Sequence, residues 1–216
     1  MDERVEAVLA AYERRIEEER AIAPQDLEPD APDTRMRAVG PATGRFLHLL
    51  ARSLRAPTIL EIGTSYGYSG IWLADAARAS GGRVITMELH DYKAVFARDM
   101  ANQAGLEAYI DFRIGDAVGL IAELETVVDL VLMDLWKDLY VPCLQALLPK
   151  LGPGAIIVAD NARPENEAIR RYGRAVRAVP GMTSVWLPIG SWLEVSRYEP
   201  AGSIYADQSG GTGGSP

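Results

Sequence analysis

Five short apolar runs alternate along this chain with segments that have the residue spacing of amphipathic helices. The runs cover residues 58–62, 83–88, 110–114, 130–134 and 155–160. The helical segments between them cover residues 69–80, 92–104, 117–124 and 140–148. Apolar runs of about five residues are typical of strands buried on both faces, as in parallel sheets. The alternation therefore predicts an α/β fold with a doubly wound, mostly parallel sheet.

The segments on either side of this alternation complete the predicted domain. Residues 43–54 and 165–178 are expected to be helices, and the runs 183–188 and 192–196 are expected to form an antiparallel hairpin at the sheet edge. We expect one domain over residues 1–198, followed by a flexible tail, 199–216, rich in Gly and Ser.

An amphipathic helix is predicted at the N-terminus, over residues 1–22, and a proline-containing connection follows it over residues 23–41. The apolar face of this helix must cover either the flank of the domain itself or a second subunit. That face consists of Val5, Val8, Leu9, Tyr12 and Ile16.

The composition argues against several classes of protein. The 216 residues are 48% hydrophobic, which suits one domain with a sizeable core. The net charge of −8 disfavours a nucleic-acid partner, because nucleic-acid binding usually needs a basic face. A single cysteine, Cys143, allows no intrachain disulfide and fits a reducing compartment. Because the sequence lacks a signal-peptide core and any membrane-length apolar run, a soluble cytoplasmic protein is expected.

Two of the apolar runs end on residues that can bind a metal ion. Asp134 ends the run 130–134, and Asp160 and Asn161 follow the apolar residues 155–159. The carboxyl ends of parallel strands meet at one edge of a sheet, where open α/β sheets bind their ligands. Carboxylate and amide oxygens suit a hard divalent cation, and Lys137 is close enough in sequence to act as a base beside it.

A glycine-bearing turn joins the first strand to the next helix. It follows Glu61 and contains Gly63 and Gly67, and Ser69 lies near the start of the helix. Glycines in such a turn let the backbone approach a ligand closely. The spacing differs from that of dinucleotide-binding turns, and a carboxylate at position 61 would repel a pyrophosphate but receive an amino group. With Glu88 ending the second strand to hold ribose hydroxyls, the pattern indicates a zwitterionic nucleoside without phosphates.

Structural explanations compete with these assignments. Gly63 and Gly67 would also suit a tight turn with no ligand, and Lys137 would also suit a solvated surface. Asp116, which follows the third strand, could reach an adenine edge or cap the next helix. These two roles for Asp116 are compatible.

Together these motifs resemble the S-adenosylmethionine-dependent, metal-dependent O-methyltransferases, and among them the catechol O-methyltransferases. The resemblance runs from about Met36 to Tyr198. Its most specific parts are Met133-Asp-Leu-Trp-Lys-Asp-Leu-Tyr140 and Ala159-Asp-Asn161. Arg37-Ala-Val-Gly40 is similar to the segment that covers the cofactor in that family. The resemblance implies the Rossmann-like fold of class I methyltransferases.

The resemblance also implies roles for the residues at matching positions. The implied cofactors are S-adenosylmethionine and Mg²⁺ or another divalent cation, and Lys137 would be the general base. The implied metal ligands are Asp134, Asp160 and Asn161. The implied cofactor-binding residues, with Asp116 added from its position, are Val39, Glu61, Gly63, Ser69, Glu88, Asp116, Ala117, Asp134 and Trp136.

The implied reaction is Mg²⁺-dependent transfer of a methyl group to a hydroxyl of a small ortho-dihydroxy aromatic acceptor. A metal chelated by both hydroxyls would align the acceptor and lower the pKa of its hydroxyl, and Lys137 would take the proton. Methylation of a hydroxylated tRNA base is an alternative that the acidic chain disfavours. A non-catalytic cofactor-binding protein is another. The resemblance also suggests a homodimer formed through the N-terminal helix and the edge hairpin.

Two departures from the catechol enzymes concern the acceptor. No acid lies around residues 184–186, where those enzymes carry a glutamate that anchors the second hydroxyl, and Glu194 is too far along the chain to replace it. Pro164 is shifted relative to the proline that follows their Asp-Asn pair. We expect the wall of the acceptor site to be formed by Met36, Arg163, Trp186 and Trp192.

Overall fold

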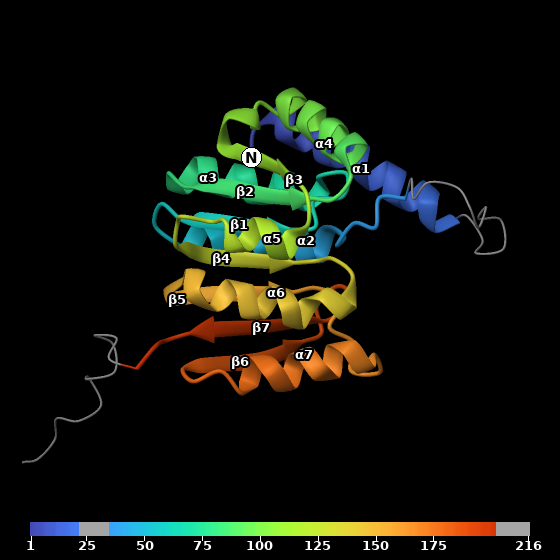
Figure 1. The fold of residues 1–216 in the computed structure, drawn as a ribbon. Coiled ribbons are helices and arrows are strands. Elements are labelled where there is room, and N and C mark those ends of the chain that lie inside the picture. Colours follow the sequence, from blue (N-terminus) through green and yellow to red (C-terminus); the bar gives the residue numbers. More distant parts are fainter. Residues whose placement is uncertain (22–34, 202–216) are drawn as a thin grey trace, which may run out of the picture.

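A computed structural model describes residues 1–21 and 35–201 of the chain. Over these residues the chain forms one sheet with helices on both faces (Figure 1). Residues 22–34 of the predicted connection and residues 202–216 of the predicted tail lie outside the described residues, so the flexibility of the tail stays a prediction. None of the described helices combines the length and the apolarity that crossing a membrane requires.

The sheet has seven strands in the order β3-β2-β1-β4-β5-β7-β6. The strands are β1 (Thr58–Ile62), β2 (Arg83–Glu88), β3 (Ile110–Ile114), β4 (Val128–Met133), β5 (Leu151–Ala159), β6 (Met182–Leu187) and β7 (Leu193–Tyr198). Strands β1 to β5 pair in parallel, whereas β7 pairs antiparallel with both β5 and β6. The predicted doubly wound sheet and its edge hairpin are therefore confirmed.

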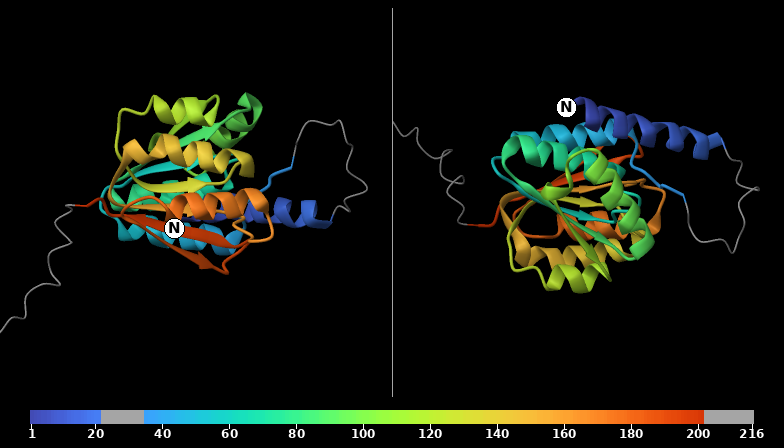
Figure 2. Two further views of the ribbon diagram at one scale, coloured as in Figure 1. Left: turned by 60° about the horizontal axis from the view of Figure 1, so that its bottom comes forward. Right: turned by 90° about the horizontal axis from the view of Figure 1, so that it is seen from above.

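Two layers of helices enclose the sheet (Figure 2). One face is covered by α1 (Glu3–Ala21), α2 (Pro41–Ser53), α3 (Tyr68–Ser80) and α4 (Asp91–Gln103). The other face is covered by α5 (Ala117–Ala122), α6 (Tyr140–Leu147) and α7 (Glu167–Arg177). Ile59 of β1 packs in the first layer, and its neighbour Leu60 packs in the second. Because successive strand residues face opposite sides of a sheet, both must be apolar, which explains the continuous apolar runs.

Strands β4 and β5 end one residue earlier than the sequence predicts, at Met133 and Ala159. Asp134 and Asp160 therefore lie just beyond the strands, in loops. Each backbone N–H still continues the parallel ladder, since Asp134 donates to the carbonyl of Ile62 at 2.9 Å and Asp160 donates to that of Met133 at 3.0 Å. These two bonds hold the aspartates at the carboxyl edge of the sheet.

The N-terminal helix α1 covers the flank of its own domain. The five residues of its predicted apolar face are all buried: Val5, Val8, Leu9, Tyr12 and Ile16. The ring of Tyr12 packs edge-on against those of Tyr68 and Phe96, and its hydroxyl donates to the backbone carbonyl of Tyr66 at 2.5 Å. The sequence allowed either the domain itself or a second subunit to cover this face, and in the structure the domain itself covers it. A homodimer stays a prediction.

Replacing Tyr12 by Phe is expected to lower the free energy of unfolding by about 1–3 kcal/mol, because the buried Tyr66 carbonyl loses its donor. Urea denaturation followed by far-UV circular dichroism measures the change. Tyr109→Phe is the matched control, since the Tyr109 hydroxyl makes no hydrogen bond within residues 1–21 and 35–201. Equal stability of the Tyr12→Phe variant and the wild type would show that this bond does not tether α1.

Candidate active site

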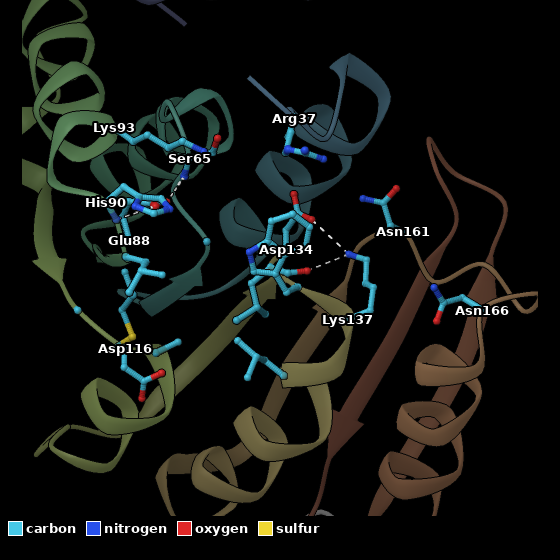
Figure 3. A pocket seen from close by; sticks show the side chains of 18 of the residues that line it. Arg37, Ser65, Glu88, His90, Lys93, Asp116, Asp134, Lys137, Asn161 and Asn166 are labelled. Atoms are coloured by element: carbon cyan, nitrogen blue, oxygen red, sulfur yellow. Dashed lines mark hydrogen bonds and ion pairs between the residues drawn. The ribbon is translucent and has the colours of Figure 1, made fainter. Parts of the chain in front are cut away.

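A cavity of about 570 Å³ opens at the carboxyl edge of the parallel strands. Figure 3 shows the side chains that converge on it from the ends of β2, β4 and β5 and from the loops around them. Its volume lies within the range of small-molecule sites, about 300–1,000 Å³. Among the predicted site residues, those that line it are Gly63, Glu88, Asp116, Ala117, Asp134, Trp136, Lys137 and Asn161.

The glycine turn after β1 lies directly against the loop after β4. Gly63 has a φ of +100°, and a Cβ added there would overlap the backbone carbonyl of Asp134. Only glycine is compatible with both this backbone conformation and this close approach. The next residues are held in place as well, because Ser65 (φ +47°) donates its hydroxyl to the carbonyl of Met36 at 2.9 Å. The turn is a rigid floor of the cavity.

Glu88 at the end of β2 is an oriented acceptor that lines the cavity. One carboxylate oxygen accepts from the backbone N–H of Ser65 at 2.7 Å, and the other accepts from that of His90 at 3.0 Å. Two backbone donors fix the plane of the carboxylate and leave lone pairs for ligand hydroxyls. His90 lines the cavity as well.

Glu61 is fully buried beneath the glycine turn and does not line the cavity. Its Oε2 accepts from the Thr86 hydroxyl at 2.5 Å, whereas its Oε1 has no hydrogen-bond partner among the described residues. Burial raises the pKa of this carboxyl from 4.5 to about 7, against hydrogen bonds from Ser69 and Thr86 that lower it. A buried acceptor without a donor is costly and suggests a missing cationic partner.

The predicted metal ligands gather at the ends of β4 and β5. The Asn161 amide donates to Asp160 Oδ2 at 2.8 Å and also contacts the Asp134 carboxylate. Burial raises the pKa of Asp134, and burial together with the Asp134 charge raises the pKa of Asp160 to about 8. Asp160 Oδ1 is buried without a hydrogen-bond partner among the described residues.

These three side chains fit a divalent cation. A buried and a partly buried carboxylate that repel each other, one with an unpartnered oxygen, are the charge distribution that a bound dication would stabilise. The third ligand is an amide, and no group of three or more His, Cys, Asp or Glu side chains is gathered anywhere in the described ranges. Since amide and carboxylate oxygens are the ligands of hard cations, this donor set suits a hard divalent cation such as Mg²⁺.

Lys137 extends its ammonium group toward the Asp134 carboxylate (Figure 3). Its Nζ lies 3.6 Å from Asp134 Oδ1 and donates to the Tyr140 hydroxyl at 2.6 Å. Burial lowers the pKa of Lys137, although the charges of Asp134 and Asp160 oppose this shift. An amine with a lowered pKa beside a cavity has the properties of a general base.

Tyr140 supports Lys137, and sequence reasoning did not identify it. The ring is fully buried, and the hydroxyl lies within hydrogen-bonding distance of the carbonyls of Met133 (3.0 Å) and Asp160 (2.9 Å). It therefore bridges the lysine to both strand ends. The only signal in the sequence was the spacing of Lys137 and Tyr140, which places them on the same side of one helical turn.

Asp116 has the predicted capping role, and its contact with an adenine edge stays a prediction. Its carboxylate caps α5 by accepting from the Gly119 N–H at 2.8 Å, and it also lines the cavity. Trp136 lines the cavity with 61% of its surface exposed, and the Arg37 guanidinium carbon lies 5.3 Å from the centre of its ring. The sequence reasoning had quoted Arg37 only as part of a covering segment.

Four predicted site residues lie outside the cavity lining: Val39, Glu61, Ser69 and Asp160, all of them buried. Of the predicted acceptor wall, Arg163 lines the cavity, whereas Met36, Trp186 and Trp192 do not. Ser65, Lys93 and Asn166 line the cavity and were not predicted. Ser65 and Asn166 lie in loops and Lys93 lies in the first turn of α4, so only the folded structure brings them to one cavity.

A family model described as O-methyltransferase matches residues 26–172, so the chain belongs to the O-methyltransferase family. Among curated relatives, catechol O-methyltransferase from Niastella koreensis is 38% identical over 57% of this chain, and that from Mycobacterium tuberculosis is 37% identical over 61%. The matches span 58% and 60% of the lengths of these two relatives, which is less than two thirds. Caffeoyl-CoA O-methyltransferase 2 from Eucalyptus globulus is 26% identical over 71% of this chain and 72% of its own length.

Solved structures show the same fold over most of the chain. The O-methyltransferase TomG from Streptomyces achromogenes, in complex with SAM, aligns with a TM-score of 0.74 and 26% identity and covers 92% of this chain and 91% of its own. The O-methyltransferase from Bacillus cereus, in complex with SAH, aligns with a TM-score of 0.70 and 27% identity and covers 92% of both chains. The class I methyltransferase fold is therefore shown.

Glu61→Gln is expected to stabilise the ligand-free protein at alkaline pH. Because folding raises the pKa of Glu61 from 4.5 to about 7, the folded protein holds this proton more tightly than the unfolded chain does. The free energy of unfolding therefore falls as pH rises through this interval. The stability of the variant relative to the wild type should rise by about 2–3 kcal/mol between about pH 5 and about pH 8.

Urea denaturation of both proteins at the two pH values measures this difference. Glu107→Gln, at an exposed position, is the control and should show no comparable change between the two pH values. The same stability difference between Glu61→Gln and the wild type at both pH values would mean that Glu61 is not strained by its burial.

Proposed function

We propose that this protein transfers a methyl group from S-adenosylmethionine to a hydroxyl of a small ortho-dihydroxy aromatic acceptor, with Mg²⁺ as its metal. The observation that carries the proposal is the position of Lys137 Nζ, 3.6 Å from Asp134 Oδ1 and next to the strand-end pair Asp160 and Asn161. The catechol O-methyltransferases among the relatives and the SAM-bound TomG structure support it.

The cofactor would lie along the glycine turn. Glu88, fixed by two backbone donors, suits the ribose hydroxyls, and the unpartnered Glu61 Oε1 suits a cationic amino group near the turn. The adenine edge would meet Asp116, and the apolar wall beside it would be formed by Ala117 and Trp136. Val39 and Ser69 support these residues from positions beneath the cavity surface.

Asp134, Asp160 and Asn161 would hold Mg²⁺, whose charge, when it is bound, lowers the pKa of a chelated phenol. Lys137 then accepts the proton of that phenol at Nζ, since its lowered pKa favours the neutral amine. The Tyr140 hydroxyl and the carbonyls of Leu135 and Asp160 orient Nζ toward the acceptor. The phenolate oxygen then attacks the methyl group in line with the departing sulfur, so alignment by the cavity supplies most of the rate.

The tRNA alternative has no supporting feature in the cavity, and the net charge of −8 opposes it. The caffeoyl-CoA relatives favour a second class of vicinal-diol acceptor, a coenzyme A thioester, for the same chemistry.

Lys137→Met is expected to lower kcat by about 10²- to 10⁴-fold, because the phenol loses its proton acceptor. Transfer of a labelled methyl group from S-adenosylmethionine to catechol measures the rate, and calorimetry with S-adenosylhomocysteine should show unchanged cofactor binding. Chelation by EDTA should abolish transfer by the wild type, and Mg²⁺ should restore it.

Lys150→Met is the matched control, because Lys150 lies just before β5, at the amino end of the strand and therefore far from the cavity at the carboxyl ends. No transfer by the wild type to any vicinal diol would contradict the proposed function. Transfer that is insensitive to EDTA would contradict the metal.

Tyr140→Phe is expected to lower kcat by about 10- to 100-fold with a smaller change in KM, because Lys137 loses the hydroxyl that aligns it. Steady-state kinetics with catechol measure both constants. Tyr172→Phe is the matched control, since Tyr172 packs edge-on against Tyr140 but its buried hydroxyl has no hydrogen-bond partner among the described residues. An equal loss of kcat in both variants would indicate a packing effect instead.

A further inference from the structure

Arginine side chains line the cavity, although the chain as a whole is acidic. The sequence has a net charge of −8, yet Arg37 and Arg163 both line the cavity near Asp134 and Asn161. The charges of Asp134 and Asp160 would be offset by the bound dication, and Lys137 is occupied with the proton of the phenol. The two arginines are therefore positive charges that the methyl-transfer chemistry does not use.

Arg163 is placed by the turn that follows the metal ligands. Its backbone N–H donates to the carbonyl of Asn161 at 2.8 Å, and its carbonyl accepts from Asn166 at 3.2 Å. The side chain is exposed and lines the cavity. Within residues 1–21 and 35–201 its guanidinium makes no hydrogen bond or ion pair, although its charge lies near enough to Asp160 to favour that carboxylate. Its donors are therefore available to a ligand that enters the cavity.

The surroundings of Arg163 reinforce this charge. Asn166 lines the same part of the cavity, and its Oδ1 caps α7 by accepting from the N–H groups of Ala168 and Ile169 at 2.9 and 3.3 Å. Its amide nitrogen is therefore left as a donor. The acid in the first turn of α7, Glu167, is paired with Arg170 and Arg174. The positive end of the helix dipole adds to the potential there.

Arg37 contributes a second charge across the cavity. Its guanidinium carbon lies 5.3 Å from the centre of the exposed Trp136 ring, so a cation and an aromatic surface lie next to each other in the cavity lining. An aromatic acceptor with an anionic substituent matches both properties.

We propose that the acceptor is an ortho-dihydroxy aromatic acid whose carboxylate is bound by Arg163, assisted by the amide of Asn166. This proposal rests on the proposed function, because chelation of the two hydroxyls at Asp134, Asp160 and Asn161 fixes one end of the ring. A carboxylate at the other end can then meet the guanidinium, which forms two parallel hydrogen bonds with such a group. Arg163 thereby selects among vicinal diols according to charge.

The test compares binding of protocatechuate, an ortho-dihydroxybenzoate, with that of its neutral alcohol analogue. Calorimetry is performed on the full chain loaded with S-adenosylhomocysteine and Mg²⁺. The wild type should bind the acid more tightly than the alcohol by about 3- to 10-fold, as a partly exposed charge pair allows. Arg163→Gln should reduce this ratio to near one, and Arg163→Lys should keep part of it.

Arg171→Gln is the matched control, since Arg171 is exposed on α7 and does not line the cavity. This variant should keep the wild-type ratio. Added salt should lower the ratio of the wild type, because the interaction is electrostatic.

Equal affinity of the wild type for acid and alcohol would overturn the proposal. An equal loss of affinity for both ligands in Arg163→Gln would also overturn it. If Arg163→Gln weakens the binding of a dihydroxycinnamoyl-CoA thioester but not that of the free acid, the anion bound by Arg163 is a phosphate and the carboxylate assignment is wrong. Methylation of the alcohol as efficiently as the acid would overturn only the acceptor class. Absence of transfer to any vicinal diol would overturn the proposed function as well.

Discussion

The close approach between the glycine turn after β1 and the loop after β4 is the constraint on which the site depends. Gly63 packs directly on the carbonyl of Asp134, and the Asp134 N–H donates back to Ile62 at 2.9 Å. The glycine turn and Asp134, the first of the proposed metal ligands, are therefore parts of one packed unit. Asp160 joins this unit through its own ladder bond to Met133, at 3.0 Å. These backbone contacts fix the glycine turn against Asp134 and Asp160, and the proposed in-line transfer would need such a fixed alignment.

The same unit contains carboxyl groups whose burial disfavours their charged form. Glu61, Asp134 and Asp160 are ionisable groups with little or no exposure, and burial raises the pKa of each of them. Buried oxygens of Glu61 and Asp160 have no donor among the described residues. Groups held in this way destabilise the empty protein and gain stabilisation only from cationic ligands. The fold can tolerate them because two extensive apolar layers enclose the sheet.

The charge near the cavity differs from the net charge of the whole chain. The acidic chain repels polyanions at long range, while Arg37 and Arg163 place positive charge in the lining of the cavity that Asp134 and Asn161 share. Such a local field acts on ligands that have already entered the cavity, where the walls exclude much of the screening solvent. Selection by charge and catalysis can therefore use separate residues within one cavity.

Sequence alone determined the parts of this protein that depend on local pattern. The apolar runs predicted the sheet, and Asp134, Asp160 and Asn161 could be predicted to meet because the carboxyl ends of parallel strands share one edge. Glu88 and Asp116 followed from the same rule. The roles of Tyr140 and Arg37, and the cover over the apolar face of α1, were decided only by tertiary structure. These depend on contacts between elements that are distant in the sequence, or on loop conformations, and neither leaves a periodic signal in the order of residues.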